Sequence, residues 1–203
     1  MEKGKGDGIF INTTGIGIVS DDVNLSADRA RPGDTVLLSG SIGERGIAIL
    51  AQREGLEFET TIESDSADLH PLVVEMLKTG STVRCMRDPT RAGFSSALNE
   101  IASQSRVGIE LDERAIPVRE EVRGACEMLG LDPLCVANEG KLVAIVEPTG
   151  AEKVLAIMRS HPLGHQIIGT VSQRNSGFVT MRTRLGTTRI VDMLAGDQLP
   201  RIC

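Results

Sequence analysis

The chain has 203 residues, of which 40% are hydrophobic and 25% charged, and this globular composition excludes a wholly disordered protein. With 22 Lys and Arg against 28 Asp and Glu, the net charge of −6 argues against nucleic-acid binding through a basic surface. The sequence has no apolar run long enough to span a membrane, and residues 1–7 lack the apolar core of a signal peptide. We therefore expect a cytoplasmic protein that does not contact the membrane.

Aromatic, cysteine and histidine residues narrow the function further. Aromatic residues make up only 2% of the chain, so few rings are available to stack on nucleotide bases. The spacings of the four cysteines match neither a zinc site nor a CxxC redox pair, and the three histidines are too scattered to form a metal site. We expect reduced thiols and no metal site made by these residues.

Strands and helices alternate in the predicted secondary structure. β-branched residues with interspersed glycines predict a first strand over residues 8–19, and polar residues 21–32 predict a connector. Seven further strands are expected at residues 35–39, 83–87, 108–111, 142–146, 166–171, 177–182 and 189–192. Five helices are expected at residues 44–54, 72–78, 92–104, 118–129 and 151–160. This order predicts an α+β layered fold with helices on the face of a mixed β-sheet.

The first candidate site is the sequence Asp-Pro-Thr-Arg-Ala-Gly at residues 88–93, between a predicted strand and a predicted helix. Backbone N–H groups at a helix N-terminus suit an anionic oxygen. The Asp88 carboxylate suits a cation, and the planar guanidinium of Arg91 suits a phosphate. The alternative interpretation is a capped helix start with an exposed arginine.

The second candidate site is Asn138-Glu139-Gly140-Lys141, directly before a predicted buried strand. Partial burial of the Glu139 carboxylate would raise its pKa toward that of a working base, whereas the charge of Lys141 would lower it. The alternative is a polar turn before a core strand. The glycine-containing segment 39–43 lacks the Lys and Ser/Thr of a P-loop, so we interpret it as a tight turn. Residues 56–67 are acidic and irregular.

The third candidate site is the C-terminal sequence Leu-Pro-Arg-Ile-Cys, residues 199–203. The thiolate of Cys203 is a nucleophile, and Arg201 favours the ionised thiol while the terminal carboxylate opposes it. Cys203 is not a prenylation site, because that modification needs three residues after the cysteine. The alternative is an incidental exposed cysteine.

Together these motifs resemble one protein family. Residues 200–203 (Pro-Arg-Ile-Cys), 138–141 (Asn-Glu-Gly-Lys) and 88–93 (Asp-Pro-Thr-Arg-Ala-Gly) resemble the HypE family of hydrogenase maturation proteins, within the AIR synthase-related (PurM-like) superfamily. Residues 10–17 also resemble the domain junction of that family. The resemblance covers essentially the whole chain, and the terminal tetrapeptide is its most discriminating part.

The resemblance implies an ATP-dependent carbamoyl dehydratase that uses Mg²⁺. In this family the carbamoyltransferase HypF loads a carbamoyl group onto the terminal cysteine, dehydration yields a thiocyanate, and the cyanide passes to iron on the HypC–HypD complex. By this resemblance Cys203 is the carrier nucleophile, and Glu139 is the acidic residue that removes protons. The residues implied to face the nucleotide are Asp88, Thr90, Arg91 and Asn138.

The resemblance also implies a domain organisation. Family members carry an N-terminal PurM-like domain that holds the Mg-binding aspartates and most of the ATP site, and through which they form homodimers. We therefore expect residues 1–31 to be a remnant strand and linker of that domain. Residues 32–193 are expected to form the PurM-like C-terminal domain, and residues 194–203 a flexible tail.

Two other functions stay open from the residues alone. The first is that of a truncated, non-catalytic module that binds the maturation partners. The second is that of another phosphoryl-transfer enzyme of the superfamily, which acts on a small amide or a selenide. The terminal cysteine motif disfavours the second function, because such enzymes need no carrier thiol at the C-terminus. A carbamoyl adduct that never dehydrates would favour the interaction module.

Overall fold

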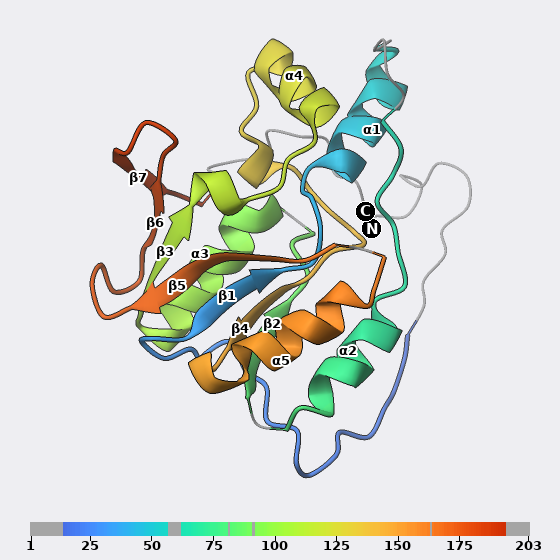
Figure 1. Ribbon diagram of the computed structural model, residues 1–203. Coiled ribbons are helices and arrows are strands. Elements are labelled where there is room, and N and C mark those ends of the chain that lie inside the picture. The colour runs from blue at the N-terminus through green and yellow to red at the C-terminus, as the bar shows by residue number, and fades with distance from the viewer. Residues whose placement is uncertain (1–13, 57–61, 81, 91, 163, 194–203) are drawn as a thin grey trace, which may run out of the picture.

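One mixed sheet organises the computed structural model, which describes residues 14–56, 62–80, 82–90, 92–162 and 164–193 (Figure 1). Its strands are β1 (Thr35–Leu38), β2 (Val83–Arg87), β3 (Gly108–Asp112), β4 (Val143–Val146), β5 (Gln166–Ser172), β6 (Val179–Arg182) and β7 (Thr188–Val191). The helices of the described residues are α1 (Glu44–Glu54), α2 (His70–Leu77), α3 (Gly93–Ser105), α4 (Glu120–Leu129) and α5 (Pro148–Arg159). Short 3-10 turns cover Glu113–Ala115 and Pro133–Cys135.

The strands lie in the order β2-β4-β1-β5-β3-β6-β7. Neighbouring strands are antiparallel except for β3 and β6, which are parallel, so the sheet is mixed as predicted. The short central strand β1 pairs with β4 on one side and with β5 on the other. All four residues of β4 are buried, which indicates that both faces of the sheet are covered there.

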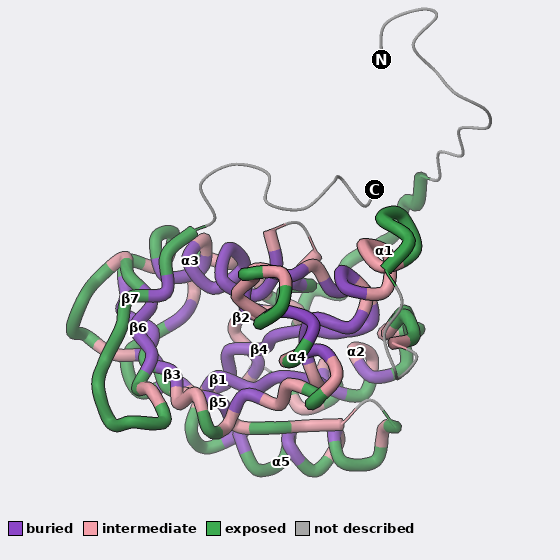
Figure 2. The backbone as a smooth tube through the Cα atoms, turned by 90° about the horizontal axis from the view of Figure 1, so that it is seen from above, coloured by how far each residue is buried: buried purple, intermediate pink, exposed green. Residues whose placement is uncertain are grey.

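Helices cover both faces of the sheet. On one face, α3 packs Phe94 and Leu98 into a core with alternate residues of β1 and β4, such as Val36. On the other face, α2 and α5 pack against the remaining residues of these strands, such as Leu37. Figure 2 shows the buried strands between α3 on one side and α5 on the other. The prediction that helices pack on a face of the sheet is therefore correct, and the structure shows that helices cover the other face as well.

A third, smaller core joins α1 and α4 beyond the ends of the central strands, at the top of Figure 1. Its buried residues are Ile47, Val122, Ala125, Cys126 and Val136. Because Val136 belongs to the chain that leads into β4, this small core ties α1 to the segment that carries the second candidate site.

Left-handed residues end three of the helices. Gly55 (φ 64°) follows α1 and Gly130 (φ 68°) follows α4, and glycine adopts this left-handed conformation without strain. Arg106 (φ 55°) ends α3 in the same conformation without the freedom of glycine. None of the described helices is long and apolar enough to cross a membrane.

The strand predicted over residues 8–19 is not formed in residues 14–19, and residues 8–13 lie outside the described part of the chain. Ile16 and Ile18 are fully exposed, at 100% and 101% of their reference areas. A strand requires a hydrogen-bonding neighbour, and the described chain pairs none with this segment. Its β-branched residues give local propensity, which is too weak to order an unpaired strand.

Candidate functional site

The three segments that follow or precede the central strands meet at one end of the sheet. Leu38 at the end of β1 and Arg87 at the end of β2 both pair with Val143 at the start of β4. We name these segments the glycine loop (residues 39–43), the Asp88 turn (residues 88–90 and 92) and the Asn138 loop (residues 136–142). The antiparallel register therefore brings the first two candidate motifs together from distant parts of the chain.

Asn138 joins these three segments. Its side-chain oxygen accepts a hydrogen bond from the Gly43 N–H at 2.7 Å, and its amide nitrogen donates to the carbonyls of Val136 at 2.9 Å and Pro89 at 3.3 Å. The Asn138 backbone N–H donates to the Pro89 carbonyl at 3.1 Å. Asn138 is fully buried, so these bonds fix the loops against one another. Whether Asn138 contacts a nucleotide stays a prediction, since its side-chain groups are already paired here.

Gly93 lets the start of α3 approach the Asn138 loop. Its φ is +69°, and a Cβ at this position would lie 2.7 Å from the Val136 carbonyl oxygen of that loop and 2.6 Å from the carbonyl carbon of the preceding Cys135. Both the backbone conformation and the space therefore require glycine. The last residue of the predicted Asp-Pro-Thr-Arg-Ala-Gly motif thus serves close packing.

Glu139 forms an ion pair with Arg45 in the first turn of α1. Arg45 Nε lies 3.4 Å from Glu139 Oε1, and the side chains are 23% and 30% exposed. The guanidinium also donates to Ser66 Oγ at 2.8 Å and to Ser64 Oγ at 3.3 Å. The Glu139 carboxylate is thus held at the end of the sheet and stays partly exposed to solvent.

Asp65 is the carboxylate whose burial raises its pKa at this site. Desolvation is the largest cause of the shift; the nearby charge of Lys141 opposes it, and that of buried Glu44 adds to it. Both Asp65 carboxylate oxygens are buried without a hydrogen-bond partner of good geometry among the described residues. The sequence predicts that burial raises the pKa of Glu139 and that the charge of Lys141 lowers it. In the structure these two opposing effects act on the Asp65 carboxylate, whereas Glu139 forms its ion pair with Arg45.

Asp65 was missed because residues 56–67 have the pattern of an irregular acidic stretch. Its burial depends on a contact across the fold, because a Cβ on Gly140 would lie 1.8 Å from the Asp65 carbonyl oxygen. The only sequence signal was a glycine beside Glu139, which permits close approach of another backbone segment. Arg45 offered a clearer signal, because a cation in the first turn of a helix opposes the helix dipole.

The other predicted residues occupy different positions. Asp88 is exposed and Thr90 is half-buried in the Asp88 turn, where the Thr90 carbonyl accepts the Gly93 N–H at 3.3 Å. Arg91 and Cys203 lie outside the described residues. Within the described part of the chain no group of three His, Cys, Asp or Glu side chains is placed to hold a metal ion.

The thiols inside the fold are poor nucleophiles. Burial raises the pKa of both Cys85 and Cys126 to about 11, and it raises the pKa of Cys135 despite a hydrogen bond with Ser95. At pH 7 a thiol of pKa about 11 is ionised in only ~1 molecule in 10,000, and the thiolate is the reactive form. The raised pKa values therefore disfavour ionisation of these three thiols near pH 7.

Comparisons with known proteins identify the domain. The family model "AIR synthase related protein, C-terminal domain" matches residues 31–182. The chain belongs to the AIR synthase-related family. Within this family it is 58% identical over 206 residues to carbamoyl dehydratase HypE of Rhizobium leguminosarum bv. viciae, and it covers 59% of that protein. The family resemblance and the α+β fold predicted from the sequence are thereby confirmed.

Solved structures of HypE proteins have the same fold as this chain. HypE in complex with ATP matches with a TM-score of 0.83 at 47% identity, over 88% of this chain and 55% of that one. HypE in a complex with HypF matches with a TM-score of 0.82 at 46% identity, over 86% of this chain and 57% of that one. This AIR synthase-related chain spans about 60% of the length of the first curated relatives that it matches.

Proposed function

We propose that this chain is the C-terminal part of an ATP-dependent carbamoyl dehydratase that makes the cyanide group for [NiFe]-hydrogenase maturation. The observation that carries the proposal is the ion-paired, partly exposed Glu139 carboxylate at the loop end of a domain whose chain is 58% identical to a HypE protein. The carrier is Cys203, the last residue. The proposed base is Glu139.

The reaction begins on sulfur. The Cys203 thiolate attacks the carbonyl carbon of a carbamoyl group presented by HypF, so that an S–C bond forms and the donor group leaves. The carbamoyl oxygen then attacks the γ-phosphorus of ATP, ADP leaves, and one N–H proton is lost. Expulsion of phosphate, together with the second N–H proton, leaves a thiocyanate on sulfur. Phosphate thus carries away the oxygen, and the amide has lost the elements of water.

Glu139 is proposed to accept the proton that leaves the carbamoyl nitrogen. A general base must lie within hydrogen-bond reach of that proton, so the carboxylate has to be both held and accessible. Its ion pair with Arg45 and its 30% exposure meet these two requirements. The Glu139 side chain is therefore suited to a substrate brought to the site on a carrier residue.

Nucleotide binding is proposed for the Asp88 turn, with Asp88, Thr90 and Arg91 facing the phosphates of ATP. Mg²⁺ is commonly held by one or two carboxylates together with substrate phosphates, and the exposed Asp88 carboxylate fits one such ligand position. Bound Mg²⁺ would neutralise charge on the phosphates. Asn138 is proposed to position the turn through its bonds to Pro89.

The proposed partners follow from the proposed chemistry. HypF supplies the carbamoyl group, and a HypE relative has been crystallised with HypF. The HypC–HypD complex receives the cyanide on iron. We also propose that residues 1–31 are a remnant and linker of an N-terminal PurM-like domain that completes the ATP site and forms a homodimer. The predicted tail, residues 194–203, lies outside the described residues. We propose that the protein acts in the cytoplasm.

The test is the intact mass of the chain after incubation with HypF, carbamoyl phosphate and ATP. We expect one carbamoyl group on Cys203, followed by loss of one water when the N-terminal portion of the Rhizobium relative is added. The Cys203→Ala variant should stay unmodified and folded. The Cys135→Ala variant is the matched control and should be modified like the native chain, because Cys135 is half-buried with a raised pKa.

Each outcome decides between the functions. A carbamoyl adduct that never loses water, even with the N-terminal portion present, would contradict the dehydratase function and support the non-catalytic interaction module. No adduct on Cys203, or normal cyanylation of the Cys203→Ala variant, would overturn the carrier role.

A further inference from the structure

Arg45 occupies a position that helix energetics disfavour. It lies in the first turn of α1, where the positive end of the helix dipole repels a cation. The acidic Glu44 before it is the residue type that this position prefers. A cation here needs a compensating partner, and the partner that the structure supplies is Glu139.

The guanidinium of Arg45 spans two segments that are distant in sequence. One terminal nitrogen donates to Ser66 Oγ and Ser64 Oγ, at 2.8 and 3.3 Å, and these hydroxyls lie 3.2 Å apart. On the other side Nε is buried and lies 3.4 Å from Glu139 Oε1. The planar guanidinium has donors at fixed angles, so two contacts on one side set where Nε points.

The segment that holds Arg45 is itself fixed against the Asn138 loop. Gly140 leaves no room for a side chain under the Asp65 carbonyl oxygen, with only 1.8 Å to a Cβ placed there. The charge of buried Lys141 also acts on the Asp65 carboxylate between the two serines. Segment 64–66 therefore lies against the residues that flank Glu139, and it also holds the Arg45 side chain that reaches Glu139.

We propose that Arg45, fixed by Ser64 and Ser66, is a positioning residue that holds the Glu139 carboxylate for proton removal. The inference rests on the proposed role of Glu139 as base. A base displaced by about 1 Å can lose ~100-fold in rate, so orientation at this residue has a large kinetic effect. Arg45 does not touch the reacting atoms in this scheme; it acts only through Glu139.

Four variants test the proposal in the dehydration reaction described above. Arg45→Gln removes the ion pair, and we expect carbamoyl loading of Cys203 to be unchanged while kcat for dehydration falls about 10- to 100-fold with KM for ATP unchanged. Arg45→Lys keeps the charge but loses the planar fork, so it should restore only part of the rate. The Ser64→Ala/Ser66→Ala double variant should lower kcat by a smaller factor.

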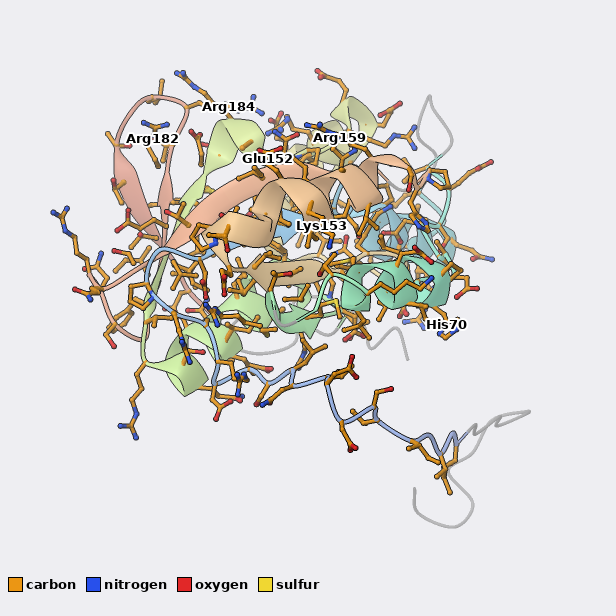
Figure 3. All side chains as sticks on the ribbon, turned by 60° about the horizontal axis from the view of Figure 1, so that its bottom comes forward. His70, Glu152, Lys153, Arg159, Arg182 and Arg184 are labelled. Atoms are coloured by element: carbon orange, nitrogen blue, oxygen red, sulfur yellow. The ribbon has the colours of Figure 1, made fainter. Side chains whose placement is uncertain are left out.

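Arg182→Gln is the matched control. Arg182, the last residue of β6, forms an ion pair with Asp112, the last residue of β3, and its side chain is 67% exposed. Figure 3 shows Arg182 far from His70, the residue that begins α2 just after segment 64–66. This variant removes an arginine–carboxylate pair of the same kind at a remote place and should leave kcat unchanged.

A second measurement separates failure of this proposal from failure of the proposed function. The carboxyl ¹³C resonance of Glu139 should move in Arg45→Gln and in the double serine variant, and stay in place in Arg182→Gln. If the native chain shows no dehydration, the function fails, and the resonance alone decides whether Arg45 positions Glu139. An unmoved resonance, or a native kcat in Arg45→Gln, would overturn the positioning role.

Discussion

At the scale of single residues, the site separates two carboxylates into different environments. Glu139 is ion-paired and partly exposed, whereas the Asp65 carboxylate oxygens are buried without good hydrogen-bond donors among the described residues. Two titratable groups in contrasting environments are typical of acid–base sites. Here the partly exposed Glu139 is the proposed base, and the buried Asp65 lies in the segment that packs beside it.

Asp65 should make the stability of the fold fall as pH rises. Its pKa lies above the ordinary value of 3.8, so above pH 3.8 the folded chain keeps a proton that the unfolded chain releases. The unfolding free energy of the native chain should therefore decrease relative to that of Asp65→Asn as pH rises from 3.8 through the folded pKa. Urea unfolding at a series of pH values measures this difference.

Asp112 provides a control of opposite sign. A hydrogen bond from Arg182 holds the pKa of Asp112 below 3.8, so its stabilising contribution is present above pH 3.8 and is lost as pH falls. Native stability should therefore decrease relative to Asp112→Asn on acidification. A stability difference between the native chain and Asp65→Asn that does not vary with pH would contradict the burial of the Asp65 carboxylate.

Among the predicted site residues, the sequence motifs identified the loop of Asn138 and Glu139 but not the partners of these residues. Lys141 is two residues from Glu139 in sequence, yet the ion pair of Glu139 is made by Arg45 from another element. From the sequence, only neighbouring residues could be considered as partners of Glu139, whereas the packing of α1 against the Asn138 loop brings Arg45 to it. The sequence patterns therefore did not predict which charged residues from distant parts of the chain form ion pairs.

At the scale of elements, the hydrophobic periodicity predicts most of the boundaries to within a few residues. The α3 helix is predicted at residues 92–104 and found at Gly93–Ser105, because Phe94, Leu98 and Ile101 share one buried face. The strand predicted at residues 8–19 is wrong over its described part because local propensity carries no information about a pairing partner.

Asn138 is expected to hold α1 on the sheet end. Replacing it by Ala leaves the Gly43 N–H and the Val136 carbonyl without their buried partner, and such losses cost about 1–3 kcal/mol each. We expect Asn138→Ala to lower the unfolding free energy by about 2–4 kcal/mol in urea titrations. The exposed Asn24→Ala is the control, with an expected change below ~0.5 kcal/mol. A similarly small loss in Asn138→Ala would show that the loops are held by other contacts.

At the scale of the whole molecule, the fold places several fixed loops at one end and keeps the described thiols unreactive. Helices cover both sheet faces, and the partly exposed carboxylate of the proposed base lies at the loop end. Burial raises the pKa of Cys85 and Cys126 to about 11, which disfavours their thiolates at pH 7; the proposed carrier is Cys203. The central claim is that the folded domain supplies the proposed base, Glu139, and that a separate residue, Cys203, carries the substrate.

The most direct test of that claim is the intact mass of the Glu139→Gln variant, read at Cys203 in the HypF, carbamoyl phosphate and ATP reaction with the N-terminal portion of the relative present. The substituted amide keeps the size of the side chain but does not accept a proton. The account predicts that the carbamoyl adduct forms on Cys203 as in the native chain and then fails to lose water. Cyanylation of Cys203 at the native rate in this variant would contradict it.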